Sequence, residues 1–373
     1  MKASSKSLLR VLAVFVIASC AILVAGVAAA TGRDAGSTAS TADCKTLRIL
    51  VWEGYADPSW VKPFEKQYGV SVKSTYIASV DQMVAKMISG GTKQYDVITA
   101  SSDNRKLLID SKVIEPIDTS QIPNYAKLYP FVKPLYTLNG KVWAVSQDWG
   151  INPFIYDKSL YKTPPTSWAV QWSPQLKNKL AIWNDYTLIY MGASVLGIDK
   201  APGVYNLSDK QLAAIKAKML QLKPNVRAVW STGGDVIQMF ATKEVSATLG
   251  WNYVYTQLVS KKVNVGQTVF PHMGPQGWND ANAVSSGVSP ECRKLAYKWI
   301  NYLSSPKAQA QIAKVTGYGP SNPGAKAYMS KALIKETFLD KPYEYLKRAD
   351  VRTDPVRRRA YIKTANEILA GLK

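Results

Sequence analysis

The feature that most constrains the fold is the regular return of a short apolar, β-branched run followed by an amphipathic stretch. The run 47–52 precedes the segment 60–68, in which apolar residues recur at helical spacing before Gly69. Such a pair predicts a strand, a loop and a helix. The pair recurs with strands at 70–77 and 95–99 and helices at 80–88 and 104–110. This alternation predicts an α/β fold with a mainly parallel sheet and right-handed crossovers.

A second set of strands and helices follows a hairpin whose turn is Asn139-Gly140. We expect the stretch 141–156 to carry the chain into a second lobe and residues 282–285 to return it to the first. The other expected strands are 180–183, 228–230, 246–250 and 263–270, and the other expected helices are 189–196, 209–222, 236–242, 292–303, 308–315 and 355–369. The sequence therefore predicts a two-lobed protein in which each lobe is a mostly parallel sheet flanked by helices.

The length and composition agree with two lobes. The chain has 373 residues, of which 47% are hydrophobic and 10% aromatic, so it can fill two cores of ordinary size. This composition excludes disorder of the whole chain. We expect the first lobe to comprise residues 46–149 and 278–335, and the second lobe to comprise residues 150–277 and 336–373.

The N-terminal segment 1–30 has the order of a secretory signal peptide, because basic residues precede an apolar run from 11 to 30 that ends in three alanines. Cleavage after this run predicts a periplasmic protein. Two alternatives stay open: retention of the run as a membrane anchor, and lipid attachment at Cys20. Residues 31–45 are rich in Ser, Thr, Ala and Gly, which predicts a flexible lead-in.

Removal of the signal peptide would leave two cysteines, Cys44 and Cys292. An oxidising compartment allows such a pair to form a disulfide. Both residues lie at the edges of expected elements, which this fold class could bring together. The alternative is that they are two unpaired small residues.

The chain is strongly basic. Removal of Lys2, Lys6 and Arg10 with the signal peptide would lower its formal charge from +21 to +18. The positive residues are scattered, with the densest patch at 347–359, and no nucleic-acid-binding motif is recognisable. We therefore expect a surface suited to a negatively charged cell envelope, and no nucleic-acid partner.

The sequence contains little catalytic machinery. Hydrolytic triads need a base beside a nucleophile, and the one histidine, His272, lies in a loop-like Pro-His-Met-Gly segment. No cluster has metal-ligand spacing, and neither a phosphate-binding loop nor a dinucleotide fingerprint occurs. We expect no catalytic residue, no metal and no cofactor. An enzyme that works through carboxylates such as Asp185 and Asp280 stays open as an alternative.

Aromatic residues stand beside polar and acidic residues in four expected loops, at 52–55, 183–186, 251–253 and 278–280. The faces of Trp and Tyr rings attract cations by about 0.5–2 kcal/mol each, and a carboxylate adds a charge-assisted hydrogen bond to an ammonium group. Taken singly, each Trp would more often pack in a core than contact a ligand. Ligands of α/β sheets bind beyond the carboxyl ends of the strands, where these loops and the loop 101–103 lie. Together they predict a site for an alkylammonium solute.

The order and spacing of several blocks resemble the periplasmic spermidine- and putrescine-binding proteins of ABC importers, over nearly all of residues 46–370. The blocks are Val-Trp-Glu-Gly-Tyr at 51–55, Tyr-Asp-Val-Ile at 95–98, Ala-Ser-Ser at 100–102, Thr-Ser-Trp at 166–168, Leu-Lys-Pro-Asn-Val at 222–226, Leu-Gly-Trp-Asn at 249–252, Gly-Trp-Asn-Asp at 277–280 and Thr-Gly-Tyr at 316–318. The resemblance implies a type II periplasmic-binding-protein fold with a ligand cleft between the lobes. It also implies that the lobes close on the ligand by hinge bending and present the closed form to the membrane permease.

The resemblance implies roles for particular residues of the cleft. It assigns an aromatic box to Trp52, Tyr55, Trp251, Trp278 and Tyr318, a hydroxyl to Ser101, and ammonium binding to Asp185 and Asp280. Glu53 and Asp103 stand where the family more often has a hydroxyl or an aromatic residue, and we include both among the expected ligand-binding residues. We expect the protein to act as a monomer.

Two departures from the family concern its acids. Leu188 stands where the family usually has a second acid after the one that matches Asp185, and Tyr253 and Val254 stand where some members carry another. The expected ligand is therefore a polyamine-like cation, with a different small solute, such as an amino-acid derivative or an anion, as the alternative. An anion would need Arg or Lys in the cleft, whereas the expected cleft loops carry acids. A role in sensing rather than import also stays open.

Overall fold

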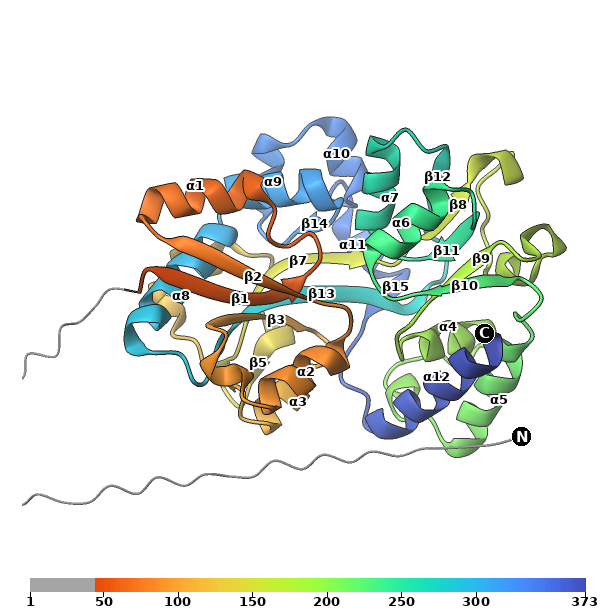
Figure 1. Cartoon of the computed structure of the whole chain (residues 1–373), viewed down its shortest axis with the longest axis horizontal. Helices are drawn as coiled ribbons and strands as arrows, with labels where there is room; N and C mark the ends of the chain where they lie inside the picture. Colours follow the sequence, from red (N-terminus) through yellow and green to blue (C-terminus); the bar gives the residue numbers. More distant parts are fainter. Residues whose placement is uncertain (1–43) are drawn as a thin grey trace, which may run out of the picture. The chain divides into compact units, whose positions relative to one another are not determined.

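Two mixed β-sheets organise residues 44–373, the part of the chain that the computed structural model describes (Figure 1). The predicted signal peptide and the lead-in up to residue 43 lie outside the described residues. The larger sheet has the strand order β14-β7-β13-β3-β1-β2, and β4 and β15 also pair with β13. Its strands are β1 (Thr46–Trp52), β2 (Ser71–Ile77), β3 (Val97–Ser101), β4 (Ile114–Glu115), β7 (Val145–Ile151), β13 (Gly274–Ser285), β14 (Gly319–Pro320) and β15 (Ala349–Val351).

The smaller sheet has the strand order β10-β9-β11-β8-β12. Its strands are β8 (Phe154–Asp157), β9 (Leu180–Trp183), β10 (Val226–Trp230), β11 (Ala247–Leu249) and β12 (Val265–Thr268). A separate hairpin pairs β5 (Thr137–Leu138) with β6 (Lys141–Val142). Its turn residues Asn139 and Gly140 have φ values of 52° and 70°, which is the left-handed conformation that the Asn-Gly signal predicts. The α/β fold with two sheets confirms the expected fold class.

Both sheets are more mixed than the sequence predicts. β1 is parallel to β2 and to β3, as expected, but β13 is antiparallel to β3 and to β7. β7 leads out of the larger sheet toward β8, and β13 leads back from β12, so these two strands run in opposite directions.

β13 corrects one expectation about the site. Residues 278–280 were expected in a loop, but they lie in the middle of this strand, which is buried along its whole length. Two of its polar side chains find partners on β7: Asn279 donates to the Ser146 hydroxyl and Asn282 donates to the Gln147 amide oxygen. Buried polar groups that find such partners can occupy a strand that hydrophobic periodicity does not reveal.

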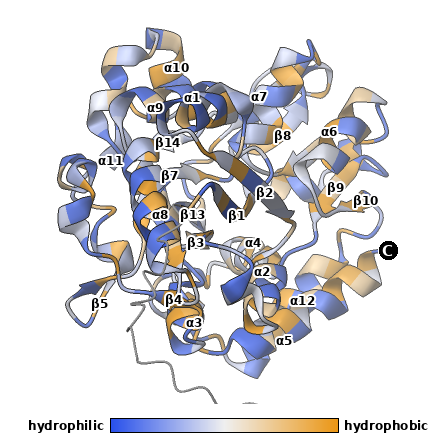
Figure 2. Cartoon of the chain, turned by 60° about the vertical axis from the view of Figure 1, so that its left-hand side comes forward, coloured by the Kyte–Doolittle hydropathy of each residue, from blue (hydrophilic) through white to orange (hydrophobic). Residues whose placement is uncertain are grey.

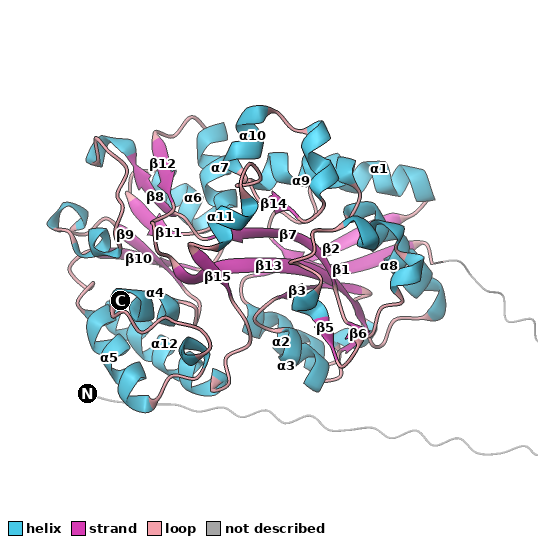
Figure 3. Cartoon of the chain, turned by 180° about the vertical axis from the view of Figure 1, so that it is seen from behind, coloured by secondary structure: helices cyan, strands magenta, loops and turns pink. Residues whose placement is uncertain are grey.

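Helices flank the two sheets, as the view from behind shows (Figure 3). The helices are α1 (Pro58–Tyr68), α2 (Val80–Ile88), α3 (Arg105–Asp110), α4 (Leu188–Val195), α5 (Asp209–Leu220), α6 (Gly233–Ala241), α7 (Asn252–Ser260), α8 (Pro290–Leu303), α9 (Pro306–Thr316), α10 (Lys331–Glu336), α11 (Pro342–Leu346) and α12 (Arg358–Leu372). The α12 helix has alternating hydrophobic and hydrophilic residues (Figure 2) and packs on α4 and α5. Its buried residues Tyr361, Ala365, Ile368 and Leu372 recur at helical spacing.

Helix α1 shows how capping residues in the sequence determine where a helix near the site begins and ends. The Asp57 side chain caps its N-terminus by accepting from the Ser59 amide, and Gly69, with φ of 63°, ends it in the left-handed conformation. Trp60 and Phe64 form the buried face, and Phe64 meets the Trp299 ring edge-on at 4.8 Å. The helix therefore keeps the loop after β1 against the larger sheet.

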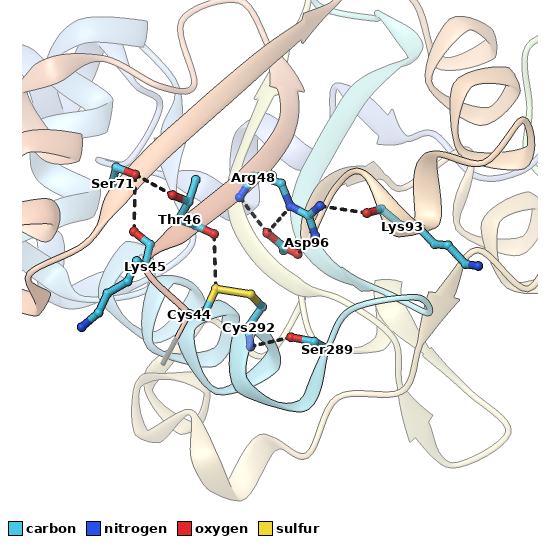
Figure 4. Close-up of a disulfide and its surroundings, with 9 residues drawn as sticks. All are labelled: Cys44, Lys45, Thr46, Arg48, Ser71, Lys93, Asp96, Ser289 and Cys292. Atoms are coloured by element: carbon cyan, nitrogen blue, oxygen red, sulfur yellow. Dashed lines mark hydrogen bonds and ion pairs between the residues drawn. A yellow bond between two sulfur atoms is a disulfide. The ribbon is translucent and has the colours of Figure 1, made fainter. Parts of the chain in front are cut away.

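Cys44 and Cys292, the pair expected from the sequence, are joined in a disulfide (Figure 4). The bond links the residue before β1 to the first turn of α8. Beside it, the Arg48 side chain donates to both carboxylate oxygens of Asp96 and to the Lys93 carbonyl oxygen. These contacts hold β1 to the segment that leads into β3.

The boundaries between lobes stay a prediction. The chain leaves the larger sheet after Ile151 and re-enters it at Gly274, and β15 then brings residues 349–351 back to the edge of β13. Within residues 44–373, no helix is both long enough and apolar enough to cross a bilayer.

Candidate ligand-binding site

A partly open cavity lies where loops of the larger sheet meet loops of the smaller one, with about 520 Å³ of empty space when the adjoining open solvent is included. Its walls contain all of the ligand-binding residues expected from the sequence, together with Val80, Trp183, Thr187 and Arg352. The expected residues are Trp52, Glu53, Tyr55, Ser101, Asp103, Asp185, Trp251, Trp278, Asp280 and Tyr318. Their binding role stays a prediction, but the structure brings them to one place. A mostly apolar cavity with a few convergent polar groups is the usual form of a small-molecule site.

The end of β1 and the tight turn that follows it form one wall of the cavity. β1 ends at Trp52, and the Tyr55 amide then donates to the Trp52 carbonyl oxygen at 3.1 Å. Gly54 in this turn has φ of 89°, and a side chain there would lie 2.9 Å from the Tyr253 ring. Only glycine fits this turn without strain, since the backbone is left-handed and Tyr253 fills the space beside it.

Aromatic rings fix one another in two groups around the cavity. Trp251 meets Trp183 edge-on at 4.9 Å and lies 6.5 Å from Trp52, so residues of both sheets form the first group. In the second group, Tyr318 meets Trp278 edge-on at 4.6 Å and Tyr55 at 6.0 Å. Edge-to-face pairs of this kind add about 0.5–1.5 kcal/mol beyond burial. The rings are therefore held in place before a ligand arrives.

Two carboxyl groups meet at the second aromatic group. Asp280 of β13 lies directly opposite Asp148 of β7, and the Tyr55 hydroxyl oxygen is 2.8 Å from a carboxyl oxygen of each. The Ser101 hydroxyl also donates to Asp280 at 2.5 Å, and the Gln147 amide donates to Asp148 at 3.1 Å. Burial raises the pKa of Asp280 to about 6 and holds the pKa of Asp148 well above its ordinary value.

The sequence pattern does not indicate Asp148 as a site residue. It lies in the stretch 141–156, which is expected only to join the lobes, and its partner comes from a strand far along the chain. A run of Gln-Asp before Trp149 in an otherwise apolar strand is the one local signal, because charged residues are rarely buried without a partner.

A second acid of the cavity, Asp103, is occupied by protein partners. Its Oδ2 atom accepts from the Tyr186 hydroxyl at 2.6 Å and lies 3.5 Å from the Arg352 Nε atom. The Arg358 guanidinium stacks over the Tyr186 ring and donates to the Asp103 carbonyl oxygen and to Asp81. Asp103 therefore ties β3 to the C-terminal segment, and its negative charge is met by Arg352 within the wall.

Arg352 is a cation in the cavity wall that the expected cleft loops do not contain. It follows β15, is 6% exposed, and its Nε and Nη1 atoms have no hydrogen-bond partner in the described part of the chain. The expected cleft loops carry acids, and the C-terminal segment adds a cation to them because β15 returns to the edge of β13. An unsatisfied buried guanidinium has an energetic cost that an anionic group would remove.

Asp185 and Glu53 have different surroundings. Asp185 lies in the turn between β9 and α4, where it accepts from the Thr187 amide at 2.9 Å, and burial raises its pKa to about 6. Glu53 accepts from the Gly234 amide at 3.1 Å, in the first turn of α6. An acid is favourable at a helix N-terminus, so Glu53 links the loop after β1 to the smaller sheet.

Leu188 and Val254, which stand where the resemblance leads one to expect acids, lie in apolar surroundings. Leu188 is 6% exposed at the start of α4, and Val254 is fully buried in α7. Neither position leaves room for an ionised group without a partner. Tyr253, beside Val254, fills the space next to Gly54 instead.

The histidine lies apart from the cavity. The His272 side chain is 65% exposed, and its Nε2 atom lies 2.7 Å from the Asp199 carboxylate. Within residues 44–373, no group of three or more His, Cys, Asp or Glu side chains has the arrangement of a metal site.

Two β-sheets, each flanked by helices, contribute loops to one cavity that is lined by aromatic rings and acids. This arrangement is that of a two-lobed solute-binding protein with the type II periplasmic fold. The chain belongs to the bacterial extracellular solute-binding protein family, whose sequence model matches residues 59–338.

Individual relatives agree with this assignment. The spermidine/putrescine-binding periplasmic protein of Salmonella typhimurium is 25% identical over 308 residues, which are 81% of this chain and 85% of the relative. The γ-aminobutyric acid-binding protein of Pseudomonas aeruginosa is 24% identical over 80% of this chain and 83% of the relative. A putative spermidine/putrescine ABC transporter structure from Listeria monocytogenes superposes with a TM-score of 0.75 at 22% identity, covering 88% of this chain and 98% of that one.

Proposed function

We propose that this protein is the solute-binding component of an ABC importer, and that it captures a polyamine such as putrescine or spermidine in the periplasm and delivers it to a membrane permease. The observation that carries the proposal is the buried carboxyl of Asp280 in a cavity walled by Trp and Tyr rings. An ammonium group would gain a charge-assisted hydrogen bond there, and the methylene stem would lie against the indole faces.

The expected ligand-binding residues support a polyamine to different degrees. Asp280 and Asp185 face the cavity as buried acids with raised pKa values, so a cation would stabilise their ionised forms. Asp103 and Glu53 are already engaged by Arg352 and by the α6 N-terminus, and we assign them to the structure of the wall. The binding set that we propose therefore centres on Asp280, Asp185 and the aromatic rings.

A thermal-shift panel tests the ligand class. The purified protein would be heated with putrescine, cadaverine, spermidine, γ-aminobutyrate, arginine, a dicarboxylate and a sugar. Stabilisation by the amines with no response to the dicarboxylate and the sugar is expected. Stabilisation by the sugar or the dicarboxylate alone would contradict the proposal.

A second candidate ligand is an amino acid with its ammonium and carboxylate groups at opposite ends of the chain. Arg352 favours it, because this buried guanidinium lines the cavity with two donors unused. One relative in the family is a γ-aminobutyric acid-binding protein. A comparison of Arg352→Gln with the wild type separates the two ligands: the variant should lose γ-aminobutyrate binding and retain or gain putrescine binding, since it removes one positive charge.

Import itself needs a test in cells. Deletion of the gene should abolish uptake of radiolabelled solute, and restoration with Asp280→Asn should not recover it. Normal uptake in the deletion strain, with altered responses to the solute, would instead favour a sensing role. Carboxylate catalysis would be detected as chemical change of the bound solute, which we do not expect.

A further inference from the structure

The Tyr55 hydroxyl stands between two carboxyl groups and has only one hydrogen to give. Its oxygen lies 2.8 Å from Asp148 Oδ1 and 2.8 Å from Asp280 Oδ2. A phenol can donate one hydrogen bond, so it satisfies one of these contacts. If both carboxyls were ionised, the second contact would place two oxygen atoms together without a hydrogen between them.

The other donors do not solve this problem. The Ser101 hydroxyl donates to the remaining oxygen of Asp280, Oδ1, and the Gln147 amide donates to the remaining oxygen of Asp148, Oδ2. Each external donor therefore serves an oxygen that does not face Tyr55. The missing hydrogen has to come from one of the two carboxyl groups themselves.

The strands hold the two acids in this position. Asp148 and Asp280 are directly opposite on antiparallel neighbours, where like charges destabilise a sheet. They are 1% and 7% exposed, so water does not screen them. The titratable and charged groups that act on the pair are Tyr55, Asp103, Tyr136, Tyr318 and Arg352. Arg352 is shared with Asp103 and leaves the negative charge of the pair largely unbalanced.

We infer that the carboxyl groups of Asp148 and Asp280, bridged by the Tyr55 hydroxyl, share one proton when no solute is bound, and that the ammonium group of the solute takes the place of that proton. This inference rests on the proposed function only in requiring a solute with an ammonium group. The ammonium enters as an intact cation, one carboxyl O–H bond breaks, and the proton passes to water. The net charge of the site stays at minus one. Asp280 lines the cavity and meets the ammonium, while Asp148 behind it acts as a positioning residue.

The direction of the pH effect follows from this exchange. Burial raises the pKa of both acids, that of Asp280 to about 6. Below that pH the proton occupies the site in a growing fraction of molecules and the solute must displace it, so affinity falls as the pH falls. Release of one whole proton corresponds to about a tenfold change in affinity per pH unit. Affinity should level off above the highest pKa of the pair in the free protein.

Calorimetry in two buffers of different ionisation enthalpy measures the exchange, with putrescine and γ-aminobutyrate as the probes. At about pH 5, one unit below the Asp280 pKa of about 6, the wild type should release close to one proton for each solute bound. Asp148→Asn keeps a side chain of the same shape without the titratable group, so its release should vanish. Glu336→Gln is the matched control, because burial also raises the pKa of Glu336 but this acid lies outside the cavity wall; its variant should still release the proton.

Infrared spectroscopy of the solute-free protein measures the shared proton without any ligand. The wild type should show the carbonyl band of a buried carboxylic acid near neutral pH, and Asp148→Asn should lack it. Binding without proton release, or full release in Asp148→Asn, would overturn the exchange. If no probe binds, the proposed function fails, and the infrared band alone tests the shared proton. A band present in the wild type and missing from Asp148→Asn supports the shared proton. A wild type without the band overturns it.

Discussion

Replacement of Gly150 by Ala tests how the fold positions the cavity wall. Gly150 of β7 lies opposite Trp278 of β13, and a Cβ atom at this position would lie 2.4 Å from Cζ2 and 2.8 Å from Cε2 of the indole ring. Ordinary contact begins near 3.4 Å, so the ring would have to move by about 1 Å. Trp278 is 5% exposed and meets Tyr318 edge-on, so it cannot move alone.

The expected losses of stability and of solute affinity in Gly150→Ala follow from overpacking and from lost ring contacts. A methyl group forced into a packed core costs about 1–3 kcal/mol of unfolding free energy. Loss of one well-placed aromatic contact, about 0.5–1.5 kcal/mol, should weaken solute binding by about threefold to tenfold. Gly203→Ala is the matched control, because a Cβ atom there meets nothing within 4 Å.

Thermal unfolding and calorimetry of both variants check this prediction. We expect Gly150→Ala to be less stable and to bind more weakly, with Gly203→Ala close to the wild type. A Gly150→Ala protein with the stability and affinity of the wild type would refute the account of how Trp278 is seated.

Other predictions concern charge and covalent linkage. Asp280→Asn should weaken binding of an ammonium solute by about tenfold or more, measured by calorimetry, because a charge-assisted hydrogen bond is lost. Cys292→Ser should lower the unfolding free energy by about 2–5 kcal/mol, measured in denaturant, since the disulfide with Cys44 closes a long loop; equal stability with and without reductant in the wild type would contradict this. The raised pKa of Asp185, about 6, disfavours its ionised form in the folded protein, so stability should fall as the pH rises from about 4 to about 6. This fall should be smaller in Asp185→Asn.

The sequence predicts the parts of the site that depend on local order. Trp52 and Ser101 lie at the ends of short β-branched runs, and a parallel sheet brings such ends to one edge. Cys44 and Cys292 could be paired from the cysteine count and the expected compartment. These features need no knowledge of how distant segments meet.

The residues that the sequence pattern misses depend on distant segments. Asp148 becomes a site residue only through its register with Asp280, because the local Gln-Asp signal in β7 does not indicate which distant strand lies opposite it. Arg352 reaches the cavity because β15 pairs with β13, a return of the chain that periodicity does not show. Trp278 and Asp280 were expected in a loop, whereas pairing with β3 and β7 holds them in a strand that contains Gln, Asn and Asp.

Native mass spectrometry of the protein purified without denaturation tests the central claim most directly. We predict that a small solute with at least one amino group co-purifies in the cavity, and that the Asp280→Asn protein is recovered without it. A co-purifying solute that lacks an amino nitrogen, retained equally by Asp280→Asn, would contradict the claim that this cavity binds an alkylammonium ligand.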